Sequence, residues 1–585
     1  MKLLQILTIS FFAAIAGGNA VAFAAPKAKD ITLQEALETD IFAPKTRDEI
    51  PCAKDKIIGK WSWEKAEKAG TIDDYPTPKV PWDKPGRIKK LIGEIDEILC
   101  GDPKKTKAFP AAEVFPGVPE GEVDLLERQV LIDPEIGGWH SLGLYAPPGQ
   151  KITVVVNGKM KTDVTLRIGC HKDFLTWSHL EKNHDGVLKR LPKMCNEIRL
   201  KAGEKKVELA NPMGGLIYLD VHRIEPKSKP VRFTISGGIA SPLFILGPKN
   251  SKGIDIAVTT QEDWQQQLAT AKAPWGEISV PRLTFTLPLD YLKLLKIPRR
   301  LCKNLQRGMA AQDWIIAWDQ FPEQINRPMR FVVDEQISVG WGHSGYPAMG
   351  YMAWGNCIKT GDLVKNGNWG LWHEIGHNHQ WAPFAFAGCG EVTVNIFSTI
   401  SQTQAIGVPY SRAWGGESIE PERYRPLALE FFKSKRTFDE EEKEVGMKLY
   451  FFIELMRGLG YDSFRKVAQR CHKEKPFNSE TTNQEKWDFF LVALSDATQK
   501  NLGPYFDIWK IDVSEKAKAK VKKYKMWSPC PGYPKNFPTY AEERKAAAEA
   551  AEAERREIIE KQKKAEAERK AAERRERAKK ILENA

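Results

Sequence analysis

The sequence has few cysteines for its length and no long apolar run beyond its first residues. Nine cysteines in 585 residues are too sparse for a small fold held by disulfide bonds, and none forms a C-x-x-C zinc or redox pattern. No later run is long enough to span a bilayer. The 37 prolines show no Gly-x-y period, which excludes collagen. A hydrophobic content of 42% with 10% aromatic residues excludes a wholly disordered chain, so we expect several globular domains.

Net positive charge is spread along the sequence. Lys and Arg number 88 against 76 Asp and Glu, which gives a formal charge of +12. The last 45 residues, from Ala541, are densely charged, but their two signs nearly cancel. Scattered charge of this kind is typical of the solvated faces of a soluble protein, so nucleic acid is not an expected partner.

The first 24 residues have the pattern of a signal peptide. A positive start at Met1 and Lys2 precedes apolar residues 3–16, and residues 22–24 (Ala-Phe-Ala) fit a small-x-small cleavage pattern. The apolar stretch of about 14 residues is shorter than the ~20 residues that a membrane span needs. We therefore expect a cleaved signal peptide over 1–24 and an exported protein without a transmembrane segment. It would be secreted, or periplasmic or at the cell surface of a bacterium.

Export makes disulfide bonds possible, and the sequence suggests two local pairs. These are Cys52 with Cys100 and Cys170 with Cys195. Because the total is odd, at least one cysteine is free or pairs between chains. The full connectivity does not follow from the sequence.

Changes in composition divide the rest of the chain into four parts. Residues 25–118 are polar and punctuated by proline; we interpret them as an N-terminal extension, with a prosegment that blocks a site as the alternative. Residues 119–248 carry short β-branched runs bounded by Gly, Pro and Asn, which predicts a β-sandwich domain. Residues 249–520 place strand-like runs before helical ones, which predicts an α+β catalytic domain. A linker and a charged tail fill 521–585, and the fold class is α+β multidomain.

The runs within these parts predict particular elements. The expected strands are residues 151–158, 163–168, 215–220, 231–235, 283–287 and 330–334, and the expected helices include 444–459 and 484–498.

The tail is rich in Ala, Glu, Lys and Arg from Thr539 onward. As a continuous helix it would extend about 68 Å. Its few large apolar residues, Ile558, Ile559, Ile581 and Leu582, leave a seam made mostly of alanine. That seam predicts a charged helix, or a weak coiled coil, rather than a firm one.

The motif with the clearest chemistry is His373-Glu374-Ile-Gly-His377. On a helix a spacing of four places both imidazoles on one face, one turn apart, so both can reach one metal ion. Zinc prefers such nitrogen ligands and keeps a position open for water, and Glu374 is near enough to take a proton from that water as general base. The alternative is a helix with incidental histidines. With ten histidines in the chain, such a match arises by chance on the order of once in a hundred sequences.

A catalytic zinc site needs a third protein ligand. The metzincin pattern would place a third histidine six residues after His377, where this sequence has Pro383. His379 would point away from the ligand face, so we expect it at the surface or behind the ligands. Glu391, which opens a second expected helix, completes a His2Glu set for one Zn²⁺ per chain; the alternative is a carboxylate favoured by the helix dipole. Asn395, one turn further on, is placed to orient a ligand.

These motifs resemble the enhancin-like, mucin-degrading zinc metallopeptidases of the gluzincin group. The resemblance is carried by residues 373–380 and 391–398 and by the step of 14 residues from His377 to Glu391. It covers about 120 to 515, and not the extension or the tail. Further similar segments are residues 138–149, 330–338, 343–349, 495–498 and 501–509.

The resemblance implies a β-sandwich followed by a gluzincin-like peptidase domain that hydrolyses peptide bonds in O-glycosylated proteins such as mucins. It also implies that the glycan is recognised beside the scissile bond. Zinc would be held by His373, His377 and Glu391, with Glu374 as general base. Two departures are an insertion over 172–193 and Trp341, which stands where the family has another aromatic residue.

Five residues are candidates for substrate contact. Tyr346 and Arg412 are candidates to stabilise the oxyanion or bind substrate, with a packed loop aromatic and a surface residue as the respective alternatives. Trp139 and Trp341, together with Trp354, are candidates to stack on sugar faces. Most of the 18 tryptophans are nevertheless expected in the core.

Three functions are open at this stage. The first is a zinc endopeptidase that acts on mucin-type glycoproteins, and the second is a zinc peptidase indifferent to glycans. The third is a mucin-binding or adhesion protein on a vestigial peptidase fold, against which the intact ligand set argues. The preferred glycan and the oligomeric state do not follow from the sequence.

Overall fold

A computed structural model describes most of the chain from Leu99 to Pro538. The described residues are 99, 101–113, 115–175, 190, 193–249, 255–358, 368–410, 413, 421–441, 445–538 and the single positions 549, 556 and 560. They fall into two compact units, residues 1–380 and 381–585. The signal peptide and nearly all of the predicted extension and tail lie outside the described residues.

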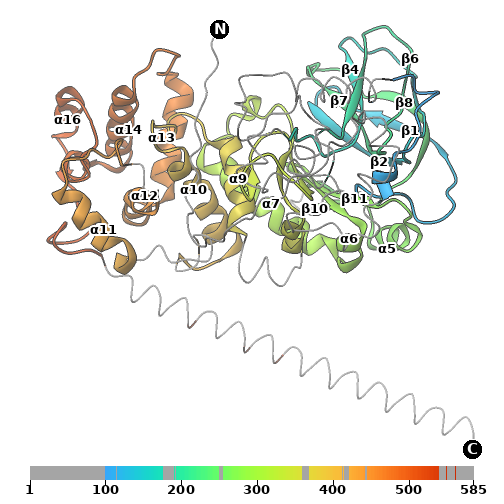
Figure 1. Ribbon diagram of the computed structural model, residues 1–585. Coiled ribbons are helices and arrows are strands. Elements are labelled where there is room, and N and C mark those ends of the chain that lie inside the picture. Colours follow the sequence, from blue (N-terminus) through green and yellow to red (C-terminus); the bar gives the residue numbers. More distant parts are fainter. Residues whose placement is uncertain are drawn as a thin grey trace, which may run out of the picture. The chain divides into compact units, whose positions relative to one another are not determined.

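The first unit opens with an eight-stranded sheet (Figure 1, blue to green). Its strands follow the order β5-β4-β7-β2-β8-β3-β6, and β1 also pairs with β8. The strands are β1 (Leu126–Ile132), β2 (Gly138–Ala146), β3 (Ile152–Val156), β4 (Val164–Ile168), β5 (Asn196–Leu200), β6 (Lys206–Leu209), β7 (Gly215–Val221) and β8 (Val231–Ala240).

Alternating burial explains why these residues form strands. In β3 every second side chain is buried, which is the period of a strand with one face on the core. β4 and β7 are buried along their whole length and contain mainly Val, Ile, Leu and Tyr. Buried side chains from these strands form one continuous apolar core. The expected strands are therefore confirmed, whereas their arrangement as a β-sandwich stays a prediction.

A mixed seven-stranded sheet follows, in the order β10-β9-β11-β12-β13-β15-β14. Its strands are β9 (Leu243–Lys249), β10 (Asp255–Ala257), β11 (Trp275–Val280), β12 (Leu283–Pro288), β13 (Met329–Asp334), β14 (Gly342–His343) and β15 (Ala348–Tyr351). β12, β13 and β15 run parallel to one another. β9 lies inside the range predicted for the first domain, but it pairs with β11. The change of sheet therefore comes near residue 241 rather than at 248.

Along the sequence, the α-helices of the first unit lie between or after the strands of this second sheet. They are α5 (Gln261–Thr270), α6 (Leu289–Leu294), α7 (Pro298–Ile315) and α9 (Trp369–His379), with short 3-10 turns at Pro110–Glu113, Pro322–Gln324 and Met352–Ile358. α7 begins with a proline, whose fixed φ suits the first helical position. Asn368 caps the start of α9: its side chain accepts a hydrogen bond from the Leu371 backbone N–H at 2.9 Å.

The second unit consists mainly of helices (Figure 1, yellow to red). They are α10 (Gly390–Ile400), a π-helical turn at Ser401–Ile406, α11 (Pro421–Lys433), α12 (Val445–Leu459), α13 (Tyr461–Glu474), α14 (Asn483–Thr498), α15 (Gly503–Ile508) and α16 (Glu515–Val521). Two short strands, β16 (Lys500–Asn501) and β17 (Lys525–Met526), pair with each other. Aromatic rings fill its interior; Phe386, for example, stacks on Trp487 at 3.6 Å between ring centroids. The expected helices over 444–459 and 484–498 are confirmed within one residue.

The cysteine prediction needs a correction. Cys170 and Cys195 are buried free thiols, so the predicted local pair is not formed. Burial raises the pKa of Cys195 to about 11, which keeps this thiol protonated and unreactive. Cys52 and Cys100 lie outside the described residues. Across the described ranges, no helix is long and apolar enough to cross a membrane.

The contact between α7 and α9 supports a first prediction. A β-carbon at Gly308 on α7 would collide with the ring of Trp372 on α9, and Trp372 is fully buried. Gly308→Ala should therefore lower the free energy of unfolding by about 1–3 kcal/mol, as overpacking of a tight core does. Chemical denaturation would measure the loss. Ala310→Ser, at an exposed position of the same helix, should change stability by less than about 0.5 kcal/mol. Equal effects of the two substitutions would contradict the packing argument.

Candidate metal centre

α9 presents two imidazoles on one face. His373 and His377 are one turn apart, and their ring centroids lie 4.7 Å from each other with the rings nearly perpendicular. His373 is 5% exposed, and the ring of Trp369 lies 4.4 Å from it. The predicted helical spacing therefore produces the predicted convergence.

The Nδ1 atom of His377 contacts the residue at the end of the same helix. Its Nδ1 lies 3.1 Å from the amide oxygen of Gln380, the residue that ends α9. With the proton on Nδ1, the lone pair that would bind a metal is the one on Nε2. Gln380 thus orients a predicted ligand, a role that the spacing of the motif did not reveal.

His373, His377 and Glu391 come together as one group. Each offers a ligand atom, and these three atoms all lie within 4.8 Å of one another; in the part of the chain that is described, no other set of three or more His, Cys, Asp or Glu side chains does this. His373 is buried, His377 is half-buried and Glu391 is exposed, so the group opens towards solvent. Two imidazoles and one carboxylate are a donor set that fits zinc. The ion itself stays a prediction.

Glu391 lies in the first turn of α10, where a carboxylate also interacts favourably with the helix dipole. The two explanations offered for this residue are therefore compatible. Asn395 is fully buried, and its Nδ2 donates to the backbone carbonyl of Glu391 at 2.6 Å. Its side-chain oxygen accepts from the Ser398 hydroxyl at 3.1 Å. Asn395 thereby steadies the turn that carries Glu391; its role in orienting a ligand stays a prediction.

His379 is not at the surface, one of the two positions expected for it. It is fully buried; its Nδ1 lies 3.0 Å from the carbonyl oxygen of Ile375, and its Nε2 lies 3.0 Å from Oδ1 of Asp313 on α7. Arg282 donates two hydrogen bonds to the same carboxylate, both at 2.9 Å. Burial alone would raise the pKa of Asp313, but these hydrogen bonds outweigh it and hold the pKa well below its ordinary value. The network fixes the end of α9 to α7.

The segment before β15 contacts α9 from another side. Gly345 exchanges two hydrogen bonds with the Asn378 side chain, at 3.1 and 2.9 Å. His343 Nε2 lies 2.7 Å from Asp173. Burial would lower the pKa of His343, but the hydrogen bond and charge of Asp173 raise it, and Glu374 adds to this rise. The predicted general base and the pair of His343 and Asp173 therefore share one electrostatic environment.

Tyr346 packs against the first sheet. Its hydroxyl accepts a hydrogen bond from the backbone N–H of Trp139 at 2.8 Å, and the Arg327 guanidinium lies 3.8 Å from its ring centroid. Gly138 has a positive φ of 85°, and any side chain there would collide with the Tyr346 hydroxyl. These contacts describe a packed loop aromatic. The role of Tyr346 in stabilising the transition state stays a prediction.

The tryptophan candidates differ in exposure. Trp139 is only 5% exposed, with Arg167 at 4.5 Å and Arg330 at 5.5 Å from its ring centroid, so its ring is largely covered; its stacking on a sugar stays a prediction. Trp354 stacks on Phe331 and fits against glycine backbone, which makes it a packing residue as well. Trp341 is 80% exposed and keeps an accessible ring. Arg412 lies outside the described residues.

The predicted insertion over 172–193 is anchored at both of its described ends. Asp173 accepts a hydrogen bond from the backbone of Ser338 at 2.6 Å. Arg190 is fully buried and donates to Asp334, at the end of β13, at 2.8 Å. The insertion thus contributes Asp173 to the surroundings of His343. Neither partner could have been inferred from spacing, because both lie more than 140 residues away.

Family models match the chain in two consecutive stretches. The N-terminal domain of M60-like peptidases matches residues 124–236. The model described as peptidase M60, enhancin and enhancin-like, matches residues 237–510. The chain therefore belongs to the enhancin-like peptidase M60 family.

Alignments with curated relatives cover about two thirds of this chain. TRPM8 channel-associated factor 2 of Homo sapiens is 29% identical over 381 residues, which are 63% of this chain and 38% of that protein. TRPM8 channel-associated factor 1 of Bos taurus is 29% identical over 378 residues, with the same shares. The chain spans about two fifths of the length of these relatives.

Solved structures have the same fold. The IMPa metallopeptidase from Pseudomonas aeruginosa has a TM-score of 0.53 and 17% identity, over 70% of this chain and 52% of that one. IMPa in complex with an O-glycopeptide has a TM-score of 0.54 and 16% identity, over 79% and 58%. A conserved protein of unknown function from Bacillus anthracis str. Ames has a TM-score of 0.53 and 21% identity, over 69% and 80%. The mixed α/β architecture is thus confirmed as that of M60 peptidases.

The network behind α9 supports a second prediction. Asp313→Asn removes the charge that Arg282 and His379 share, so it should lower the free energy of unfolding by about 3 kcal/mol, as loss of one partner in a buried pair does. Denaturant titration at pH 7 would measure this change. The matched control is Asp163→Asn, which removes an exposed pair with Arg199 and should cost less than about 1 kcal/mol.

The pH dependence of this effect has a definite sign. Because the folded-state pKa of Asp313 is depressed, its stabilisation is present above the ordinary carboxyl pKa of about 3.9 and is lost as the pH falls below it. The stability difference between wild type and Asp313→Asn should therefore be constant near neutral pH and shrink below about pH 4. A difference that persists unchanged in acid would contradict the assigned role of the charge.

Proposed function

We propose that this chain is a zinc endopeptidase that hydrolyses peptide bonds in mucin-type O-glycosylated proteins. The observation that carries the proposal is the convergence of His373, His377 and Glu391 within 4.8 Å, with Glu374 beside the first histidine on α9. Membership of the M60 peptidase family supports the peptidase class. The solved complexes of IMPa with T-antigen and with an O-glycopeptide support a glycoprotein substrate.

The protein residues divide the chemical work. Zinc held by the two histidines and Glu391 would polarise the scissile carbonyl and lower the pKa of a water molecule. Glu374, half-buried and next to His373, takes the proton from the attacking water and delivers it to the leaving amine. Gln380 and Asn395 hold His377 and the Glu391 turn in place, so the ligand set is organised before substrate arrives.

The same proposal includes the organisation of the whole chain. A signal peptide over 1–24 would export the protein. The β-sandwich predicted from residue 119 and the catalytic domain predicted to end at residue 520 would meet near residue 241, where the sheets change. The two family-model stretches, which meet at residue 236, support a boundary close to the one predicted. Residues 521–585 would form the linker and charged helix. Trp341 and Arg412 are proposed to contact the substrate.

A second candidate function is binding without catalysis. The curated relatives are named for association with the TRPM8 channel rather than for peptidase activity. A protein of this fold could therefore act by holding a partner. The complete His2Glu group and Glu374 favour the enzyme, and the following experiment separates the two.

Glu374→Gln should reduce cleavage of an O-glycoprotein by about 10²- to 10⁴-fold, because it removes the general base. Zinc content by elemental analysis should stay near one ion per chain, and the thermal melting curve should not change. Mass spectrometry of the products would measure the cut sites and rates. His377→Ala, by contrast, should lose both zinc and activity. A wild-type protein that binds glycoprotein but cuts none would favour the binding function.

A separate experiment tests whether cleavage depends on the glycan. Parallel digests of the same substrate, before and after enzymatic removal of its O-glycans, should show cleavage of the glycosylated form only. Equal cleavage of both forms would leave the peptidase proposal intact and refute the part that concerns the glycan.

A further inference from the structure

The first unit contains a polar hollow of about 520 Å³ close to the segment that contacts α9. Residues of β2, β4, β5 and β7 line one side, and residues before β13 and β15 line the other. The charged side chains that line it are four cations and two carboxylates: Arg167, Lys172, Arg223, Arg327, Glu197 and Asp220. Positive charge therefore exceeds negative charge in this hollow.

Arg167 is a buried residue in the wall of this hollow rather than an exposed surface cation. It is 6% exposed and lies over the ring of Trp139, and one of its terminal nitrogens pairs with Glu197. Its Nε is buried and has no hydrogen-bond partner among the described residues. A buried donor of this kind costs free energy while it lacks an acceptor. A ligand in the hollow would meet the exposed guanidiniums of Arg223 and Arg327, and the charge of Arg167 behind them adds to the attraction for an anion.

The other three cations add charge that no described carboxylate neutralises directly. Arg223 and Arg327 form no ion pair with any residue that the structure describes, and Arg327 lies flat against Tyr346. Among the described residues, the one acceptor of Lys172 Nζ is the backbone oxygen of Tyr346, at 3.3 Å. Partial burial, and then the charge of Arg167, lower the pKa of Lys172, although Glu197 and Asp220 oppose this shift. The ammonium is thus poised to gain from an added negative charge.

The uncharged lining is suited to a sugar. Ile224, which is 38% exposed, provides apolar surface, while His222 and Asn326 provide polar groups that can hydrogen-bond hydroxyls. A volume of this order, with mixed apolar and polar walls, is typical of small-ligand sites. A saccharide that carries an acidic group matches both the hydroxyl partners and the excess positive charge.

The hollow is joined to the metal helix by a short chain of contacts. Lys172 bonds to the Tyr346 carbonyl, and the preceding residue, Gly345, bonds to Asn378 on α9. Asn378 directly follows the predicted ligand His377. A glycan held in the hollow would therefore lie against the segment that contacts α9.

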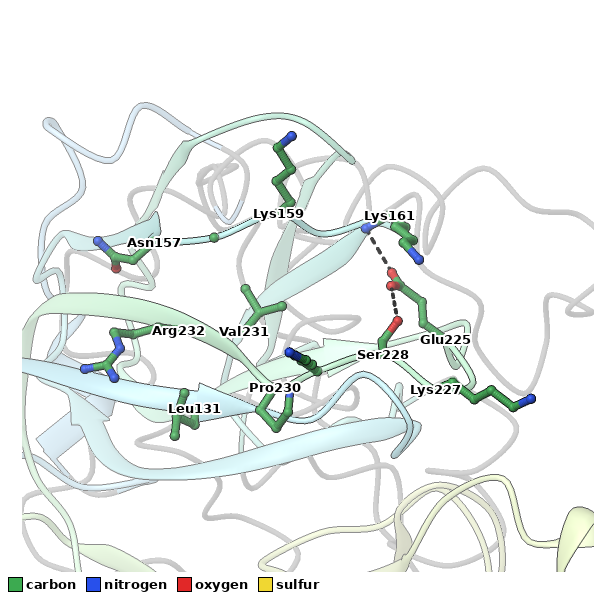
Figure 2. Close-up of a pocket in the computed structure, with 12 residues that line it drawn as sticks. Leu131, Asn157, Lys159, Lys161, Glu225, Lys227, Ser228, Pro230, Val231 and Arg232 are labelled. Atoms are coloured by element: carbon green, nitrogen blue, oxygen red, sulfur yellow. Dashed lines mark hydrogen bonds between the residues drawn. The ribbon is translucent and has the colours of Figure 1, made fainter.

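A second basic hollow in the first unit offers a comparison with the hollow at Arg167. Figure 2 shows Lys159 and Lys227 extending away from each other, and the Glu225 carboxylate bonded to Ser228 and to the Lys161 backbone. Glu225 places a negative charge in this hollow. Burial would raise the pKa of its carboxyl, but hydrogen bonds from Thr162 and its neighbours lower it. This hollow has a similar volume and a larger excess of positive charge, with five cations against one carboxylate, so it serves as a control.

We propose that the hollow at Arg167 and Arg327 binds the carboxylate or sulfate group of an acidic sugar on the O-glycan of the substrate. The proposal rests on the proposed function for the identity of the substrate. It goes further, because it assigns the first sheet a part in selecting sialylated or sulfated glycans over neutral ones.

The test is a binding measurement on the full chain carrying Glu374→Gln, so that substrate is not consumed. The probes are one O-glycopeptide in three forms: sialylated, neutral after sialidase treatment, and sulfated. Calorimetry should show at least one acidic form binding about tenfold more tightly than the neutral form, and the two acidic arms identify which acid is preferred. Arg223→Ala with Arg327→Ala should abolish this preference and leave binding of the neutral form unchanged.

The matched control is Lys159→Ala with Lys227→Ala, which removes the same charge from the same unit at the second hollow. It should keep the acidic preference. Equal losses in the two double variants would show a general field rather than a site, and would overturn the proposal. Melting curves would check folding; if the Arg327 change lowers stability, Arg223→Ala alone, at an exposed position, should still weaken the preference.

Failure of the site and failure of the proposed function can be told apart. Free 3′-sialyllactose and a sulfated lactose, with lactose as the neutral reference, probe the hollow without any peptide. Binding of an acidic trisaccharide or disaccharide that is lost in the Arg223 and Arg327 variant would support the site even if no glycopeptide is cleaved. Cleavage of glycopeptides with no preference for acidic over neutral saccharides in either assay would refute the site and leave the peptidase intact.

Discussion

The buried ion pair of Arg330 and Glu277 is the contact on which much of the first unit depends. Arg330, on β13, is 3% exposed; it pairs with Glu277 on β11 and also donates to the Trp139 carbonyl at 2.8 Å and the Ser141 hydroxyl at 3.0 Å on β2. Glu277 in turn accepts from Tyr218 on β7 at 2.9 Å. A buried guanidinium is tolerated when an opposite charge and further hydrogen bonds compensate its burial; of the Arg330 donors, the Nε alone lacks a partner among the described residues. The second sheet can satisfy this one only while the first sheet lies against it.

From this pair a series of contacts leads to the candidate metal centre. Arg330 holds the backbone of Trp139, whose N–H in turn binds the Tyr346 hydroxyl. The residue before Tyr346, Gly345, binds Asn378 on α9, while Asp313 binds His379 one residue further. α9 is thus fixed on sides other than the one that carries its two predicted ligands. A helix fixed in this way holds those imidazoles at a set spacing, which limits the entropy lost when a metal or substrate binds.

The sequence could predict what depends on local periodicity. A spacing of four on a helix decides that His373 and His377 share a face, and alternation in residues 151–158 decides that they form a strand. It could not predict partners that meet only through tertiary folding, such as Asp313 for His379, 66 residues away. Trp139 shows the same limit, because whether a tryptophan ring is free depends on which side chains cover it, here Arg167 and Arg330. Cys170 and Cys195 lie close together, as supposed, yet closeness does not decide whether a disulfide forms.

The charged groups of this unit fall into two kinds, and the difference has a physical meaning. Around Arg330 and Asp313 each charge faces an opposite charge, so these clusters contribute rigidity. In the hollow at Arg167, by contrast, the guanidiniums of Arg223 and Arg327 are exposed and have no ion-pair partner among the described residues, while Arg167 pairs with Glu197. Cations held together in this way repel one another, so the two exposed guanidiniums contribute no stability of their own. An anionic ligand would relieve this repulsion, which is why the hollow, and not the better-paired clusters, is the place to look for an additional contact with substrate.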